Sequence, residues 1–308
     1  SRRRTELMGL AAILIILHHC NIRLPFAAWN YAVNRNGSMG VDFFAFLSGF
    51  GCVFSLKKSP GLGRYFARRL EKLIPSYYVC LALMYAILGV PSFASLASSV
   101  IPLNAFTGEP GGSWYVSASL LYYLLIPAAL ALLGRARRPR AVFALLLLAA
   151  ALVIPGATRS TGWTLAVMRL PALVCGVAAG TLCFAEAGKR DWIDACAAAA
   201  LMYAAGLLLM RHPYALSRAP LNLISHKQAL YLEKGLRAPL WLLLLAAALE
   251  GLERTPLRFV NIPLRHAGRR SLELYLGHEL VEAFFVTCFG FSGWRRWAVM
   301  IALAWPAA

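Results

Sequence analysis

The sequence predicts an all-α fold: a polytopic transmembrane helical bundle with about ten spanning helices and a cytoplasmic N-terminus. The 308-residue chain is 60% hydrophobic and only 14% charged, whereas a soluble protein of this length carries roughly 25% charged residues. Its mean hydropathy is +0.63. No segment has the composition of a separate soluble domain, so we interpret residues 1–308 as a single integral-membrane domain.

Each spanning helix needs about 20 apolar residues. The first apolar run lacks the cleavage site of a signal peptide, so we expect it to stay as a helix. The last segment is short, and we expect its helix to be incomplete. The predicted spans are 6–22, 39–56, 74–90, 113–133, 140–155, 164–186, 194–210, 237–253, 270–289 and 294–308.

The orientation follows from the basic residues. The net charge is +18, with 31 Lys and Arg against 13 Asp and Glu. With a cytoplasmic N-terminus, about twice as many of these cations fall on the inner as on the outer side, as the positive-inside rule requires. Because the cations lie between apolar segments, their predicted partner is the lipid bilayer, not nucleic acid. The seven cysteines form no CxxC pair, and we expect core thiols and no metal site.

Ionisable residues within spans are candidates for function, because their burial in lipid is costly. His18 and His19 end the first span, and Asp42 begins the second span near the same, outer face. A histidine beside a carboxylate is the usual arrangement of a general base with a fixed tautomer. The alternatives are a histidine in the headgroup region and a carboxylate that caps a helix.

Further polar residues are predicted near the same outer face. Trp114 and Ser117 begin the fourth span, Arg169 lies within the sixth, and His278 lies in the middle of the ninth. They are predicted to line a polar cavity that binds substrate. Trp114 could instead belong to the interfacial aromatic belt, and Arg169 could extend its charge to the membrane surface.

The inner side carries a basic segment, Lys57 to Pro75, in which Arg68, Arg69 and Lys72 are close in sequence. Such segments often do no more than contact anionic lipid. The functional interpretation is a binding site for a phosphate-rich cytosolic ligand.

Six segments, in this order, resemble acyltransferase family 3, the integral-membrane O-acyltransferases of bacterial surface polysaccharides and related acceptors. The second, which contains Ser48, is very close to the family's second-helix signature. The segments are "MGLAAILIILHH", "GVDFFAFLSGF", "RRLEKLIPSYYV", "SWYVSASLLYYLLIP", "RLPALVCG" and "RSLELYLGH".

The resemblance implies transfer of an acyl group, with acetyl expected, from cytosolic acyl-CoA to a hydroxyl of an envelope glycan or other acceptor. It implies a multi-pass protein of the bacterial plasma membrane, with acyl-CoA as co-substrate and no bound cofactor. By the resemblance His19 is the catalytic histidine, with Asp42 to orient it, and Ser48 belongs with the substrate-binding residues. Arg68, Arg69 and Lys72 would bind acyl-CoA.

One position departs from the family pattern. Met8 stands where the family has a basic residue, eleven positions before the histidine. Arg4 lies one helical turn before Met8 on nearly the same face. Either Arg4 replaces the missing charge, or Arg69 and Lys72 act without it.

Two mechanisms and one other function stay open. His19 could act as a general base or could carry the acyl group itself. A different function would be a proton-coupled transporter or exporter of a surface glycan, with His19, Asp42 and His278 as a proton relay.

Overall fold

The structure is a computed structural model, and it describes residues 3–20, 25–58, 61–108, 113–135, 138–154, 161–216 and 223–289. These residues form helices and no strand, as the all-α prediction requires. The α-helices are α1 (Arg4–Cys20), α2 (Ala27–Trp29), α3 (Met39–Lys58), α4 (Leu62–Leu88), α5 (Phe93–Val100), α6 (Asn104–Thr107), α7 (Trp114–Arg135), α8 (Pro139–Val153), α9 (Thr161–Met168), α10 (Leu170–Phe184), α11 (Lys189–Arg211), α12 (His226–Glu253), α13 (Asn261–Arg269) and α14 (Ser271–Phe289). A π-helix, η1 (Asn30–Arg35), precedes α3, and a 3-10 helix, η2 (Pro256–Val260), precedes α13.

Six stretches of the described chain are long and apolar enough to cross a membrane. They correspond to the predicted spans 39–56, 74–90, 113–133, 164–186, 194–210 and 237–253. The helices concerned are α3, α4, α7, α9 together with α10, α11 and α12.

The other predicted spans have different outcomes. The segment predicted at 6–22 is α1, a helix of only 17 residues, and the segment at 140–155 is α8, with 15 residues. The segment at 270–289 is α14, which carries Glu273, Glu279 and Glu282. The predicted span 294–308 lies outside the described residues. The described residues therefore support a multi-pass membrane protein, and they contain six clear spans.

The basic segment is mostly helical, although the sequence suggested a loop up to residue 73. Helix α4 begins at Leu62 and continues through Pro75 to Leu88. Arg68, Arg69 and Lys72 therefore lie on the first turns of a long helix. A proline is tolerated here because neighbouring helices and local adjustments can satisfy the carbonyl that loses its donor.

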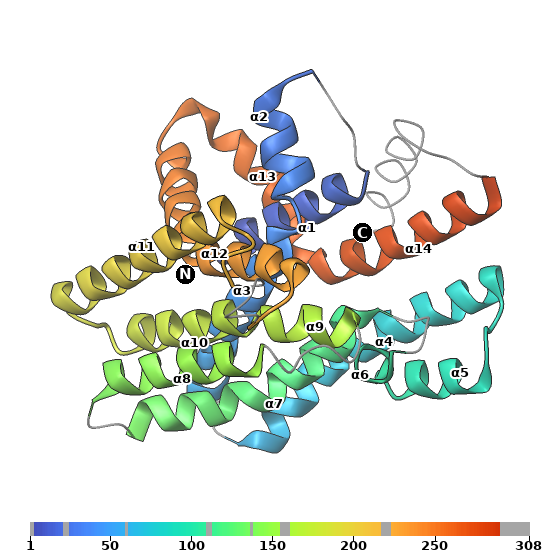
Figure 1. Cartoon of the computed structure of the whole chain (residues 1–308), viewed down its shortest axis with the longest axis horizontal. Helices are drawn as coiled ribbons and strands as arrows, with labels where there is room; N and C mark the ends of the chain where they lie inside the picture. The colour runs from blue at the N-terminus through green and yellow to red at the C-terminus, as the bar shows by residue number, and fades with distance from the viewer. Residues whose placement is uncertain are drawn as a thin grey trace.

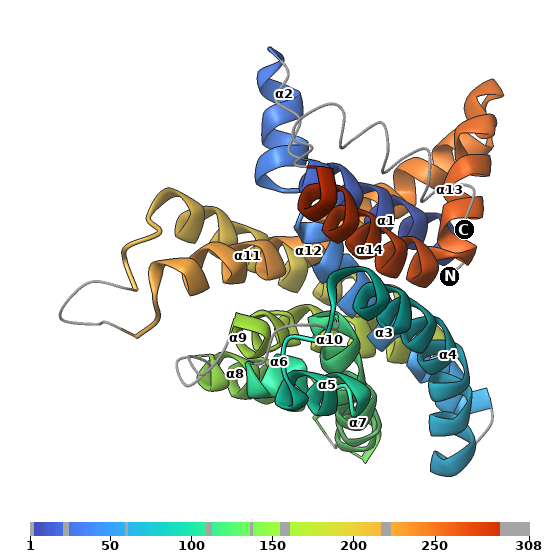
Figure 2. The same cartoon turned by 90° about the vertical axis from the view of Figure 1, so that its right-hand side faces the viewer.

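Helix α3 is the centre of the fold, and it packs against α1 on one face and against α10 on another. Figure 1 shows α3 crossing behind α10 and α7. The contact with α10 depends on small residues, since a Cβ atom at Gly176 would collide with the carbonyl oxygen of Phe46. Close approach of this kind is typical of helix pairs in membranes. Figure 2 shows α11 and α12 side by side as a pair that projects from this centre.

The start of α1 is fixed to the end of α12 by ion pairs. Arg3 lies 2.9 Å from Glu250 and 2.9 Å from Glu253, and 3.2 Å from Glu6. The hydrogen bond to Glu250 contributes most to raising the pKa of Arg3 above its usual value. These contacts place the first residues of α1 and the last turn of α12 at the same end of the bundle.

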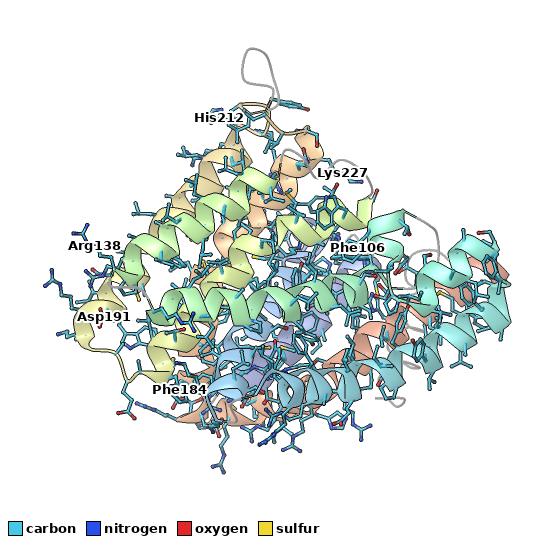
Figure 3. All side chains as sticks on the ribbon, turned by 90° about the horizontal axis from the view of Figure 1, so that it is seen from below. Phe106, Arg138, Phe184, Asp191, His212 and Lys227 are labelled. Atoms are coloured by element: carbon cyan, nitrogen blue, oxygen red, sulfur yellow. The ribbon has the colours of Figure 1, made fainter. Side chains whose placement is uncertain are left out.

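The surface of the bundle suits a bilayer. Large apolar side chains are exposed along several helices, for example Leu201 at 73% and Leu152 at 68%. The connections between helices alternate between two sides: Figure 3 shows Arg138, Phe184 and Asp191 on one side of the helices and Phe106, His212 and Lys227 on the other. This alternation is the one that the predicted order of spans requires.

Candidate functional site

Two histidines from opposite ends of the chain meet at the end of α1. His19 lies in the last turn of α1, and its Nδ1 is 2.7 Å from Nε2 of His278 in α14. The two rings are stacked, with their centroids 4.9 Å apart. His278 is fully buried, and His19 is partly exposed. The structure therefore combines an accessible imidazole with a buried one that fixes its orientation.

A carboxylate stands beside this histidine pair. Oε2 of Glu282 lies 3.9 Å from Nδ1 of His19. Residues 278 and 282 are one helical turn apart on α14, so their side chains share one face. Glu282 was not predicted from the sequence, although the spacing of His and Glu in "GHELVE" was the available signal.

The neighbouring His18 has a different environment. Its Nδ1 lies 3.3 Å from the backbone carbonyl oxygen of Val33, in the π-helix η1 before α3. It points away from His278, because successive residues on a helix are turned by about 100°. This separation supports His19 as the member of the HH pair at the candidate site.

The predicted contact between Asp42 and His19 is not made. Asp42 is fully buried and lies 3.3 Å from Arg169, the residue between α9 and α10. The reason is the rotation of α3: Gly40 faces α1, where a Cβ atom would collide with Ala11. Asp42 is turned about 200° from Gly40 around the helix axis. It therefore points toward α10 and α12, away from α1.

Asp42 and Arg169 belong to a buried charge cluster with three residues of α12. Glu233 and Arg237 form a buried ion pair with each other. The Nζ atom of Lys234 donates to Ser38, and its ammonium lies 5.5 Å from the ring of Tyr231. The sequence had placed Lys234 in a long loop, but α12 already begins at His226, where Ser225 forms a capping box. The structure thus places His19 with His278 but puts Asp42 in a different cluster. This arrangement does not support a proton relay made of these three groups.

A separate cavity of about 90 Å³ lies toward the other end of α1, where α1, α3, α4, α7 and α14 meet. Cations line one part of it, and hydroxyl groups and aromatic rings line the rest. The lining residues are Arg4, Met8, Phe44, Ser48, Arg69, Lys72, Leu73, Tyr115, Ser119, Tyr123, Ser271, Leu272 and Tyr275. We call it the basic cavity.

Two arginines are held in place at the basic cavity. The Nε atom of Arg4 donates to the carbonyl oxygen of Leu47 at 3.1 Å. The guanidinium of Arg69 lies 5.8 Å from the ring centre of Tyr65 and 5.9 Å from that of Tyr123. Its Nε is buried without a hydrogen-bond partner in the described chain. Because an unsatisfied buried donor is costly, this atom is suited to an anionic ligand.

The predicted donor-binding residues do not all reach the basic cavity. Arg69 and Lys72 line it, one helical turn apart on α4. Arg68 does not line it, and instead donates to the carbonyl oxygen of Ser55 at the end of α3. Met8 lines the cavity beside Arg4, so the charge that is absent at position 8 is present one turn away in the same space.

An aromatic layer separates the basic cavity from the histidine pair. Tyr115 lies 5.2 Å from Tyr275 and 6.0 Å from Phe44, measured between ring centres. Phe44 and Tyr275 meet edge to face at 6.4 Å. On the far side, Tyr275 is 5.2 Å from the ring of His278. The cavity and the histidines are therefore neighbours across a single layer of rings.

The remaining predicted residues have structural contacts. The hydroxyl of Ser117 is buried and donates to Asn104 in α6 at 2.7 Å. Trp114 packs edge to face against Tyr115. Ser48 lines the basic cavity with Tyr115 and therefore lies with the cations, on the opposite side of the aromatic layer from His278.

The histidine site also has the donor set of a metal site. His19, His278 and Glu282 each offer one ligand atom, and these atoms lie within 4.8 Å of one another. Two histidines and one carboxylate are a usual ligand set for Zn²⁺ in catalytic sites. The short contact between the two ring nitrogens equally suits a shared proton, which is the arrangement that a base needs.

A helical bundle with membrane spans, a histidine pair and a basic cavity has the features of a membrane enzyme. A comparison with known protein families identifies the class. The profile of acyltransferase family 3, described as an acyltransferase domain, matches residues 7–307. The chain therefore belongs to this family of membrane acyltransferases, as the six motifs suggested. No curated protein and no solved structure matches the chain.

Proposed function

We propose that this protein transfers a short acyl group, acetyl in the first instance, from cytosolic acyl-CoA to a hydroxyl of a bacterial envelope glycan. In this proposal the ends of the helices near Arg4 and Arg69 face the cytoplasm, and His19 faces the outer side of the plasma membrane. The positive-inside rule supports this orientation.

The basic cavity is the proposed acyl-CoA site. Arg4, Arg69 and Lys72 give it three cations, which suit the phosphates of CoA. The small volume and the aromatic layer of Phe44, Tyr115 and Tyr275 favour a short acyl chain, because a long one would have no room. The polar groups Ser48, Ser119 and Ser271 are placed to bind the amides of the pantetheine arm.

His19 is the proposed general base. It takes the proton of the acceptor hydroxyl, whose oxygen attacks the thioester carbonyl carbon. The carbon–sulfur bond then breaks, the ester is formed, and the CoA thiolate takes up a proton and leaves as free thiol. Glu282 is a positioning residue in this scheme: its negative charge stabilises the imidazolium that forms on His19. General-base help of this kind contributes typically about 10²–10⁴-fold to the rate.

The observation that carries the proposal is the placement of the basic cavity and the histidine pair on the two sides of one aromatic layer. A donor site and a base at this separation fit an enzyme that takes its acyl group from one side and its acceptor from the other. Family membership supports acyl transfer independently.

The test uses the full chain in proteoliposomes with acetyl-CoA labelled in the acetyl group. We expect label to enter a glycan fraction of a bacterial envelope, with free CoA thiol released in equal amount. His19→Gln should lower both by 10²-fold or more, whereas His18→Gln should not. Label that stays on the protein after a single turnover would support an acyl-histidine in place of the base mechanism, and full activity of His19→Gln would refute both.

A further inference from the structure

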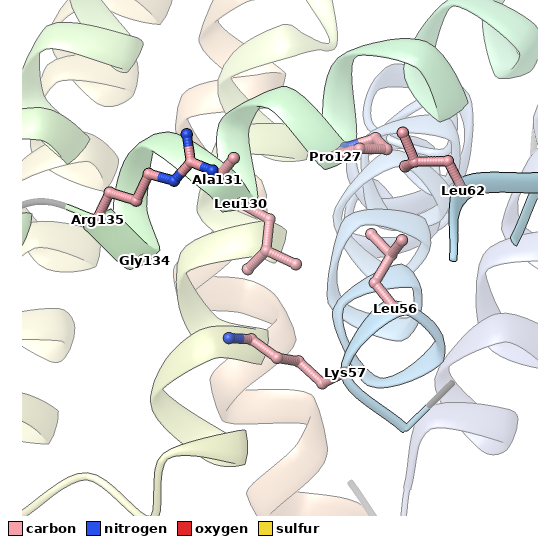
Figure 4. A pocket seen from close by; sticks show the side chains of 8 residues that line it. All are labelled: Leu56, Lys57, Leu62, Pro127, Leu130, Ala131, Gly134 and Arg135. Carbon is pink, nitrogen blue, oxygen red and sulfur yellow. The ribbon is translucent and has the colours of Figure 1, made fainter. Parts of the chain in front are cut away.

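A second cavity, separate from the basic cavity, opens between the end of α3, the start of α4 and the second half of α7. Its volume is about 380 Å³, within the usual range of ligand pockets. The two cavities share no lining residue. Figure 4 shows the side chains around it, and we call it the apolar groove.

The apolar groove has two chemically different parts. Leu56, Leu62 and Pro127 lie together on one side, and Lys57 and Arg135 lie on the other, with Leu130 between the cations. Leu62 is 56% exposed, so this part of the groove opens outward at the surface of the bundle. Its walls would therefore meet lipid chains in a bilayer.

The two cations have no carboxylate partner in the part of the chain that the structure describes. Lys57 and Arg135 are both exposed, and neither takes part in an ion pair there. Arg3, at the same end of the bundle, is by contrast paired with Glu250 and Glu253. Lys57 and Arg135 are therefore available to an anion.

We propose that the apolar groove binds an anionic phospholipid of the inner leaflet, with its phosphate between Lys57 and Arg135 and an acyl chain along Leu56, Leu62 and Pro127. The apolar wall would add no binding energy for a soluble anion, and the cations would add little for a neutral lipid. A membrane at the basic end of the bundle offers a ligand that carries both parts.

The same three helices also build the basic cavity, through Ser48 of α3, Arg69 of α4 and Tyr123 of α7. A lipid that fills the groove braces these helices from outside. Lipid binding is measured without any acyl transfer. A negative result for lipid binding can therefore be distinguished from a negative result for the proposed enzymatic function.

The experiment is native mass spectrometry of the full chain in detergent, titrated with phosphatidylglycerol or with phosphatidylethanolamine of the same acyl chains. We expect tighter binding of phosphatidylglycerol to the wild type. Lys57→Gln with Arg135→Gln should weaken it about tenfold or more and leave phosphatidylethanolamine unchanged. The matched control is Lys58→Gln with Arg138→Gln, which removes the same charge from exposed residues outside the groove.

A second variant fills the groove without removing charge. Gly134 lines the groove, and a Cβ atom there would meet no atom within 4 Å, so Gly134→Trp is chosen to place an indole ring in the groove. It should abolish the preference for phosphatidylglycerol. Gly251→Trp, at an equally open position on α12, is the control for the added bulk.

Three outcomes would overturn the proposal. An equal loss of phosphatidylglycerol binding in the two double variants would show that the lipid is attracted unspecifically to surface charge. Unchanged binding in Gly134→Trp would show that the lipid lies elsewhere. Displacement of the lipid by millimolar inorganic phosphate would assign the cations to a free anion.

Discussion

His19 and His278 are separated by 259 residues in sequence, yet their ring nitrogens lie 2.7 Å apart. One nitrogen of this contact donates and the other accepts, so the pair holds a single proton between them. Glu282, 3.9 Å from Nδ1 of His19, favours the tautomer with the proton on that atom. The other nitrogen of His19 is then the one that takes a proton from the acceptor.

A change of Glu282 to Gln tests this arrangement. The variant keeps the size of the side chain but removes the charge that stabilises the imidazolium. We expect kcat to fall about tenfold to a hundredfold, a fraction of the full general-base contribution. KM for acetyl-CoA should stay constant, because Glu282 does not line the basic cavity. Glu282→Asp should recover part of kcat, whereas a rise in KM alone would rule out a role in positioning the base.

The basic cavity has a cation at Arg4 and none at Met8, and this difference gives a second prediction. Arg4→Gln removes one charge-assisted contact, so KM for acetyl-CoA should rise about tenfold to a hundredfold while kcat changes little. Met8→Arg in the same chain should restore KM, since both side chains line the cavity. Arg68→Gln is the control, because Arg68 contacts Ser55 instead. No effect of Arg4→Gln would leave Arg69 and Lys72 as the donor-binding cations.

At the scale of helices, a buried ion pair joins α3 to the residue before α10, in addition to the close packing of small residues. Asp42 and Arg169 are both at most 1% exposed, and loss of either would leave the other without its nearest opposite charge. Removal of one partner of a buried pair costs about 3–5 kcal/mol, whereas replacement of both is often neutral. The pair therefore tests whether Asp42 holds helices together or serves catalysis.

We expect Asp42→Asn to lower the melting temperature of the detergent-solubilised protein strongly, and Asp42→Asn with Arg169→Gln to recover most of the loss. The measurement is thermal unfolding, followed by the acetyl-transfer assay on each variant. If the double variant regains both stability and activity, Asp42 is structural. If it regains stability but stays inactive, the two residues contribute to the reaction in a way that their distance from His19 does not explain.

The helices themselves were largely predictable from sequence, because a run of apolar residues such as 39–56 has a single outcome in a bilayer. The rotation of each helix was not predictable. Gly40 and Asp42 are two residues apart, and only packing against α1 and α10 decides which one faces which helix. His19 and His278 were both found as intramembrane polar residues, but their contact depends on how α14 lies against α1.

Some errors had a more local cause. The segment after Lys57 is rich in cations, and hydropathy alone favoured a loop there, whereas α4 begins at Leu62 with its basic residues on the helix. Likewise, Lys234 was predicted to lie in a loop, because the first turns of α12 are polar. Lys234 instead lies on the helix, and its hydrogen-bond partner Ser38, which accepts from Nζ at 2.8 Å, is remote in sequence.

At the scale of the whole molecule, the connections fall on two sides, and the proposed orientation assigns one of them to the cytoplasm. Asp191→Cys and Lys227→Cys lie on opposite sides, as Figure 3 shows. In a chain whose own cysteines are replaced, an impermeant maleimide should label Lys227→Cys in intact cells. It should label Asp191→Cys only after permeabilisation. The reverse pattern would place the N-terminus outside and contradict the proposed direction of transfer.

The aromatic layer of Phe44, Tyr115 and Tyr275 has a consequence for the cell. Three rings packed this closely leave no room for a nucleotide between the basic cavity and the histidine pair. If acetyl transfer proceeds as proposed, the carrier returns to the compartment that supplied it, and each cycle exports two carbons while the CoA pool stays constant. The envelope can then be decorated continuously at the expense of ordinary carbon metabolism, with no need to synthesise the carrier anew.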